Sequence, residues 1–191
     1  MFQKDDFFRS IISPSPDVTS DISGFSALFA EKAISKDSHF IRESEENVSI
    51  GFVSSGIFRS YILDYDGKEA IFRFITRGEL LSGGFAFLHP SPMNIQALTD
   101  AAVYTADWTD VADFCKANRG FMKTLNGFLS KGSFSTTRLL SNFIRLNAKD
   151  RYLLFAKEYP QLLEQIPHYH IANHLGISSV QLSRIRKSLR H

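Results

Sequence analysis

The chain has 191 residues, 43% hydrophobic and 13% aromatic, so it can bury a sizeable core, and its composition is not that of a disordered chain. A single cysteine, Cys115, excludes an intrachain disulfide and the cysteine-rich zinc and iron–sulfur sites. The net charge of +2 hides an asymmetry, because residues 1–113 carry −8 and residues 114–191 carry +10. This asymmetry predicts an acidic module joined to one that contacts a polyanion.

The first residues do not read as a secretory signal. Charged side chains interrupt the apolar residues of 1–12, at Lys4, Asp5, Asp6 and Arg9, so there is no continuous apolar segment. No stretch of the sequence approaches the length of a membrane span. We therefore expect a cytoplasmic protein without a membrane partner.

The first half of the chain predicts two helices followed by a sheet. Residues 2–12 form an amphipathic pattern that ends before Pro14, and residues 25–33 suggest a second helix. The pattern then changes to a period of two, which predicts strands at residues 49–53, 56–63, 69–75, 95–98 and 102–106. Short strands separated by glycine and proline favour a small antiparallel barrel or jelly roll.

The helical period returns near Thr109. Residues 111–117 predict a short helix, and residues 121–146 predict a long one whose middle is weakened by glycine, serine and threonine. One stripe of this long helix approximates the seam of a parallel dimer, although packing on the chain's own barrel would give the same pattern. We expect a shared role for the stripe residues Phe121, Leu125, Phe128, Leu139 and Phe143.

A further helix is predicted at residues 148–158, with Asn147 as its N-cap. The chain thus divides into three predicted segments. They are an effector-type barrel with flanking helices at residues 1–112, a dimerisation region at 113–146 and a DNA-binding domain at 147–191.

The last 26 residues carry the strongest functional signal. Pro167 can open a first helix, and Gly176 suits the left-handed residue that ends it. Ser178 can then cap a second helix, with Gln181 completing a capping box. Two short helices joined by a tight glycine turn predict a helix-turn-helix, the motif that places its second helix in the major groove of DNA.

The second helix has two distinct faces. Leu182, Ile185 and Leu189 share one side and are expected to face the core, and no acidic residue follows Glu164. On the other side, Arg184 can reach a guanine edge and Val180 a thymine methyl group. The remaining basic residues suit phosphate contacts. The predicted DNA-binding residues are Ser179, Val180, Ser183, Arg184, Arg186, Lys187 and Arg190.

The sequence resembles the Crp/Fnr family of transcription regulators over nearly its whole length. The resemblance is strongest from Ile166 to Ser178 and from Leu182 to Lys187, and it includes Arg151-Tyr152, Glu158-Tyr159-Pro160 and residues 64–69. It implies an α+β fold with a cyclic-nucleotide-binding-like barrel, a long dimerisation helix and a C-terminal winged-helix-type helix-turn-helix, although little chain remains for a wing strand. The family's base-reading positions fall on Ser179, Val180 and Arg184. The implied partners are a second copy, a near-palindromic operator in double-stranded DNA and, as a further candidate, RNA polymerase.

The effector site departs from the cyclic-AMP-binding pattern of that family. Gly83 stands where the ribose glutamate is expected, and no lysine or arginine lies between Arg77 and Lys116 to meet a cyclic phosphate. We therefore expect no response to cyclic AMP, and either an unknown effector or none. The residues that would line an effector pocket are Gly78, Glu79, Ser82, Gly83, Gly84, Thr136 and Thr137.

Other functions fit the sequence less well. His170 and His174 have the spacing of a helical zinc pair but lack a third ligand, and His39 and His89 are weak candidates for haem ligation. A cupin-type enzyme would need a cluster of histidines and carboxylates in the barrel. We expect no enzyme, metal or cofactor. The main alternative is a small-ligand sensor whose DNA binding is weak or vestigial.

Overall fold

A computed structural model describes residues 4–12, 21–46, 48–83 and 90–189. The chain divides into two compact units, each made from two stretches of sequence. The first unit contains residues 1–60 and 74–133, and the second contains residues 61–73 and 134–191. The three-part division expected from the sequence remains a prediction.

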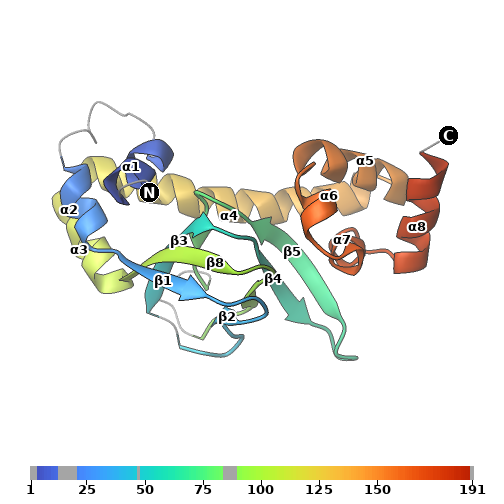
Figure 1. Ribbon diagram of the computed structural model, residues 1–191, viewed down its shortest axis with the longest axis horizontal. Coiled ribbons are helices and arrows are strands. Elements are labelled where there is room, and N and C mark those ends of the chain that lie inside the picture. The colour runs from blue at the N-terminus through green and yellow to red at the C-terminus, as the bar shows by residue number, and fades with distance from the viewer. Residues whose placement is uncertain (1–3, 13–20, 47, 84–89, 190–191) are drawn as a thin grey trace. The chain divides into compact units, whose positions relative to one another are not determined.

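Two four-stranded sheets form the β-structure (Figure 1). The first has the order β1-β8-β3-β6, with β1 at Ala30–Ile34, β8 at Ala101–Asp107, β3 at Ser49–Ser55 and β6 at Leu80–Leu81. The second has the order β2-β7-β4-β5, with β2 at His39–Ile41, β7 at Asn94–Ala97, β4 at Phe58–Leu63 and β5 at Glu69–Ile75. Pairings between β1 and β8, β3 and β8, β3 and β6, and β2 and β7 are antiparallel, which confirms the predicted jelly-roll type.

The second half of the predicted helix at residues 25–33 is wrong. Helix α2 covers only Ile22–Ala27, and β1 begins at Ala30, which pairs with Thr105 of β8. Glu31, Lys32 and Ala33 are good helix formers by local preference. Ladder hydrogen bonds with a strand about seventy residues later override that preference, which residues 25–33 alone do not reveal.

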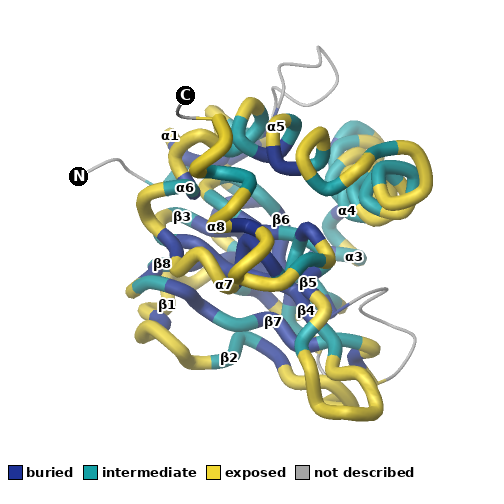
Figure 2. The backbone as a smooth tube through the Cα atoms, turned by 90° about the vertical axis from the view of Figure 1, so that its right-hand side faces the viewer, coloured by how far each residue is buried: buried dark blue, intermediate teal, exposed yellow. Residues whose placement is uncertain are grey.

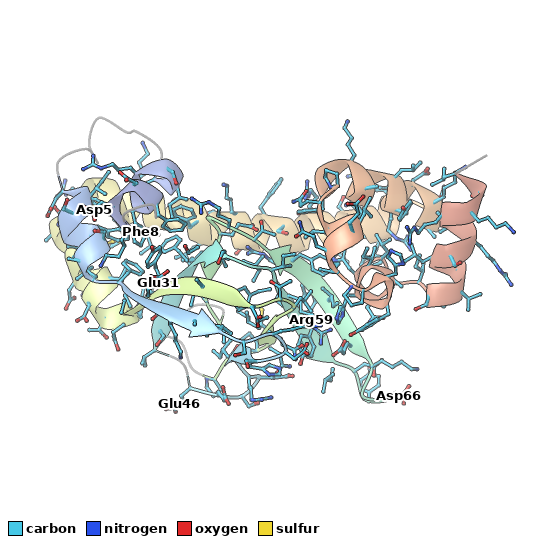
Figure 3. All side chains as sticks on the ribbon, in the orientation of Figure 1. Asp5, Phe8, Glu31, Glu46, Arg59 and Asp66 are labelled. Carbon is cyan, nitrogen blue, oxygen red and sulfur yellow. The ribbon has the colours of Figure 1, made fainter. Side chains whose placement is uncertain are left out.

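An aromatic cluster fills the space between the helices and the first sheet. It joins α1 (Lys4–Ile11), α2, α3 (Trp108–Ala117) and the start of α4 (Arg119–Arg145). Phe8, labelled in Figure 3, is fully buried at its centre, with its ring within 6 Å of those of Phe25, Phe29, Phe52 and Tyr104. Edge and tilted contacts of this kind add to the burial of apolar area.

A second core, mostly aliphatic but with one phenylalanine, lies within the barrel. Its members come from both sheets and are almost completely buried, as the dark segments of the strands in Figure 2 illustrate. They are Ile34, Ile41, Val53, Phe58, Ile75, Leu81, Ile95, Ala97, Ala101 and Val103. The alternation that predicted the strands therefore reports on burial against this core.

The second unit combines a β-hairpin tip with the C-terminal helices. In the hairpin, the Asp64 carboxylate accepts the backbone N–H groups of Asp66 and Lys68, and Gly67 has a φ of 76°. The helices are α5 (Ala148–Glu158), α6 (Leu162–Gln165), α7 (His168–His174) and α8 (Ser179–Ser188). Residues 134–189, all of which the structure describes, contain no strand, so this segment has no wing.

Replacing Phe8 by alanine should cost about 3–5 kcal/mol of unfolding free energy, because it would leave a cavity and remove contacts with five aromatic rings. Urea unfolding followed by circular dichroism measures this change. Tyr65→Ala is the control, since Tyr65 is fully exposed and its truncation should change stability by less than about 0.5 kcal/mol. Equal midpoints for the two variants would contradict the assigned core.

Candidate nucleic-acid interface

The turn between α7 and α8 has the hydrogen bonds expected of a helix-turn-helix. Gly176 has a φ of 62°, its N–H donates to Asn173 O at 3.2 Å, and the N–H of Ile177 donates to Ala172 O at 3.0 Å. These two bonds form a Schellman motif, which ends α7. Ser178 Oγ then accepts the N–H of Gln181 at 3.1 Å and so caps α8. The predicted glycine turn and serine cap are both present.

Helix α8 buries one side chain deeply and exposes the face predicted to contact DNA. Leu182 is 1% exposed and Ile185 is half-buried, which fits their expected core positions. Leu189 is 38% exposed, so its expected place in the core is wrong. It follows Ser188, the last residue of α8, where the helix has passed beyond the core. The predicted DNA-binding residues Ser179, Val180, Ser183, Arg184 and Lys187 are all exposed, and Arg190 lies outside the described residues.

A groove of about 400 Å³ lies between the start of α7 and the face of α8. Within it, Arg186 Nη1 lies 2.7 Å from Nδ1 of His168. Arg186 is half-buried, whereas Arg184 and Lys187 are exposed. The lining residues are His168, Ser179, Leu182, Ser183, Arg186 and Lys187, which include two permanent cations and no carboxylate. A groove of this composition can accept an anion.

The two histidines with zinc-like spacing have other surroundings. His170 is 3% exposed, and its ring lies beside that of Tyr169. His174 Nδ1 lies 3.1 Å from the carbonyl oxygen of Ile71 in the hairpin, and its ring contacts Phe155. Among the described residues, no three histidine, cysteine or acidic side chains are grouped to hold a metal. Burial, together with the nearby Arg138, lowers the pKa of His174 to about 4.

The long helix α4 presents different residues to the core and to solvent. Of the predicted dimer residues, Phe121 and Leu125 are each 3% exposed and Phe128 packs against the same aromatic cluster. Their side chains are therefore engaged within this chain. Leu139 is half-buried, and Phe143 is 38% exposed. The most exposed apolar side chains of α4 are Phe134, Leu140 and Ile144, which the sequence prediction did not select.

Comparisons with known proteins agree with this architecture. A family profile described as "Cyclic nucleotide-binding domain" matches residues 31–118. FixK2 from Bradyrhizobium japonicum superposes with a TM-score of 0.78 at 19% identity, covering 85% of this chain and 84% of that one. A structure from Eubacterium rectale assigned to the Crp/Fnr family of transcriptional regulators gives 0.69 at 16% identity, covering 90% and 83%. The chain has the Crp/Fnr fold.

A third solved structure with the same fold is that of a regulator described as responsive to a nucleotide. The regulator CLP from Xanthomonas campestris, described as c-di-GMP responsive, has a TM-score of 0.69 at 18% identity, covering 88% of this chain and 90% of that one. No curated protein matches the sequence. In the part of the chain that the structure describes, no helix is both long and apolar enough to cross a membrane.

The Crp/Fnr fold raises the question of whether the barrel fits a cyclic nucleotide. A Cβ added at Gly83 would collide with Ile41 Cδ1 and would lie 2.9 Å from Ser91 Oγ, so a larger residue at this position would require these two side chains to shift. The Glu79 carboxylate instead accepts the N–H of Thr76 at 2.8 Å, which closes the turn at Gly78, where φ is 81°. Residues 78–115 contain no lysine or arginine that could meet a cyclic phosphate, which agrees with the sequence expectation, and the lack of a response to cyclic AMP stays a prediction.

The predicted effector residues are not brought together within one unit. Gly78, Glu79, Ser82 and Gly83 belong to the first unit, whereas Thr136 and Thr137 belong to the second and are exposed. Gly84 lies outside the described residues. The effector pocket predicted from these residues therefore stays a prediction.

Sequence reasoning missed His168 in the groove, because only the fold brings the start of α7 beside Arg186. The signal that could have identified it was positional, since His168 follows the proline that opens the first helix. Leu140 and Ile144 could also have been found, because they are i, i+4 neighbours on one helix face.

The buried imidazole of His174 should make stability depend on pH. Its folded pKa of about 4 lies below the ordinary value of 6.5, so the unfolded chain takes up the proton first as the pH falls. This contribution is fully present above about pH 7 and is lost between pH 6.5 and 4. In urea unfolding, wild type should lose up to about 1.4 kcal/mol per pH unit more than His174→Gln in this window. The exposed His168→Gln variant should follow wild type, and equal slopes for wild type and His174→Gln would contradict the assignment.

Proposed function

We propose that this protein is a dimeric, sequence-specific DNA-binding transcription regulator of the Crp/Fnr type. The observation that carries the proposal is the face of α8, where Val180, Arg184 and Lys187 are exposed on a helix that Leu182 anchors in the core. The capped, glycine-turned geometry supports insertion of this helix into the major groove. A basic helix face that is merely solvated would not need the N-cap, the glycine turn and the buried Leu182 together.

The contacts of α8 divide into base reading and backbone binding. Arg184 is suited to donate two hydrogen bonds to a guanine edge, and Val180 is suited to pack on a thymine methyl group. Lys187, Arg186 and Arg190 supply positive charge for phosphates, with Ser179 and Ser183 as hydroxyl donors. Because phosphate contacts release counterions, binding should weaken steeply with added salt.

The long helix α4 supports assembly of two copies. Leu140 and Ile144 are 61% and 77% exposed, which is costly for large apolar side chains unless a partner covers them. A second copy packed along this face through a two-fold axis would bury Leu140 and Ile144 of both copies. Two recognition helices about 34 Å apart would then select a near-palindromic operator.

The barrel supports a regulator that does not respond to cyclic AMP. A glycine at the position of the ribose glutamate and the lack of lysine or arginine in residues 78–115 both oppose that ligand. We infer that the barrel either binds another small effector or acts as a scaffold. RNA polymerase remains a candidate partner, and we propose no catalytic role.

Arg184→Ala should remove most of the preference for the selected operator and leave much of the non-specific binding, because only base contacts carry sequence information. Lys187→Ala is the matched comparison, since it removes the same charge from a phosphate position. It should weaken binding to all sequences alike and reduce the slope of log K against log salt by about 1. Gel-shift titrations against the operator and a scrambled duplex measure both effects. Full discrimination by Arg184→Ala would contradict the assigned role.

Ile144→Glu should convert a dimer into a monomer, because a carboxylate would have to be buried between the two copies of α4. Sedimentation equilibrium should show the mass falling by about half. Leu153→Glu places the same charge at another exposed apolar residue, on α5, and should leave the dimer intact. A wild-type monomer, or an unchanged mass for Ile144→Glu, would contradict dimerisation through this face.

A further inference from the structure

Arg151 connects the end of the long helix to the turn of the helix-turn-helix. Its Nη1 donates to the carbonyl oxygen of Leu146 at 2.7 Å, and its Nε donates to the carbonyl oxygen of Leu175 at 3.1 Å. Leu146 directly follows α4, and Leu175 caps α7. Carbonyl groups at such positions lack partners within their own helix. One guanidinium therefore completes two helix C-termini, and its charge complements the negative ends of both helix dipoles.

Phe143 of α4 holds the same guanidinium in place. The Cζ atom of Arg151 lies 4.9 Å from the centroid of the Phe143 ring, a cation–π distance. The ring also lies against Gly176, where an added Cβ would be only 2.6 Å from Phe143 Cε1. The close approach of α4 to the turn before α8 thus depends on an aromatic ring at 143 and on a glycine at 176.

A second contact restrains the angle between α4 and α5. Arg138 Nη1 of α4 donates to Glu158 Oε1 of α5 at 2.7 Å. Glu158 is the last residue of α5, whereas Arg151 lies in its first half. The two contacts therefore hold α5 to α4 near both ends, and Arg151 extends this connection to α7.

We propose that Phe143, Arg151 and Gly176 form a joint that fixes the direction of α8 relative to α4, and so sets the spacing between the two recognition helices of the dimer. This inference rests on the proposed function. Phe143 and Arg151 are positioning residues, because they act through the turn before α8 and have no assigned contact with bases. A stiff joint allows both half-sites to bind at one spacing, whereas a loose joint lowers the effective concentration of the second helix and tolerates other spacings.

The joint requires arginine rather than a generic cation. A planar guanidinium can donate from Nε and Nη1 in two fixed directions while its face lies on an aromatic ring. A lysine ammonium is a compact charge that cannot reproduce both directions and the stacking together. Arg151→Met retains much of the apolar stem and removes both donors and the charge.

The test compares spacing preference with half-site affinity in the full-length protein. Wild type first selects an operator from a random duplex pool. Dissociation constants are then measured for that operator, for the operator with two added central base pairs, and for one half-site. The variants are Arg151→Met and Phe143→Leu, which keeps apolar bulk without the aromatic face. Arg145→Met is the control, because it removes the same charge from an exposed residue at the end of α4.

In both joint variants, the preference for the selected spacing should fall by about tenfold, the equivalent of one hydrogen bond to a charged group. Half-site affinity should stay within about twofold of wild type, and Arg145→Met should keep the wild-type preference. If both joint variants retained the wild-type spacing preference, the proposed role of the joint would be overturned. A parallel loss of half-site binding would also overturn it, since that loss would mean that α7 and α8 had become disordered. Failure of wild type to select any sequence would instead overturn the proposed function.

Discussion

The proposed DNA-binding face depends on one backbone conformation, the left-handed geometry of Gly176. At a φ of 62°, the chain reverses within two residues, so that the N–H of Ile177 reaches Ala172 O and Ser178 arrives in position to cap α8. Any residue with a Cβ would be strained in this conformation and would also collide with Phe143. The same glycine thus sets the angle between α7 and α8 and permits the contact between the turn and α4. The backbone conformation of this one residue therefore also determines where α8 is placed.

The charge of the second half of the chain is arranged around this constraint. Only three acidic residues follow residue 114, and none lies on α7 or α8. The carboxylate of Asp150 accepts from Asn147 Nδ2 at the N-cap of α5, and Glu158 pairs with Arg138. These two acids therefore support the helical framework, and the cations of α8 keep an unneutralised face. Positive charge concentrated on an anchored helix is the arrangement that a phosphate backbone attracts most strongly.

The elements that could be predicted from sequence are those specified by local chemistry. Ser178 and Asn147 are recognisable N-caps, and Gly176 is a recognisable helix stop, because each acts on neighbouring backbone groups. Elements specified by distant partners could not be predicted in this way. The strand at Ala30–Ile34 exists because β8 pairs with it, and the three-residue strand β2 is too short to show a period. The groove residue His168 depends on a contact made across the fold.

The residues predicted to form a dimer interface show a different limit of sequence reasoning. A helical period identifies apolar stripes, but it does not say which body covers each stripe. Helix α4 carries two kinds of apolar side chain, since Phe121 and Leu125 complete the aromatic core while Leu140 and Ile144 face solvent. The change occurs along the helix, because its first half packs in one compact unit and its last residues belong to the other. A single apolar stripe predicted over the whole helix therefore included both core residues and exposed residues.

The barrel combines a defined turn with a well-packed apolar core. The turn at Gly78 has a left-handed glycine, and Glu79 supports it by accepting from the N–H of Thr76. Leu81 and Ile41 are almost fully buried and belong to the apolar core of the barrel. Stability of this part of the chain thus comes from apolar packing.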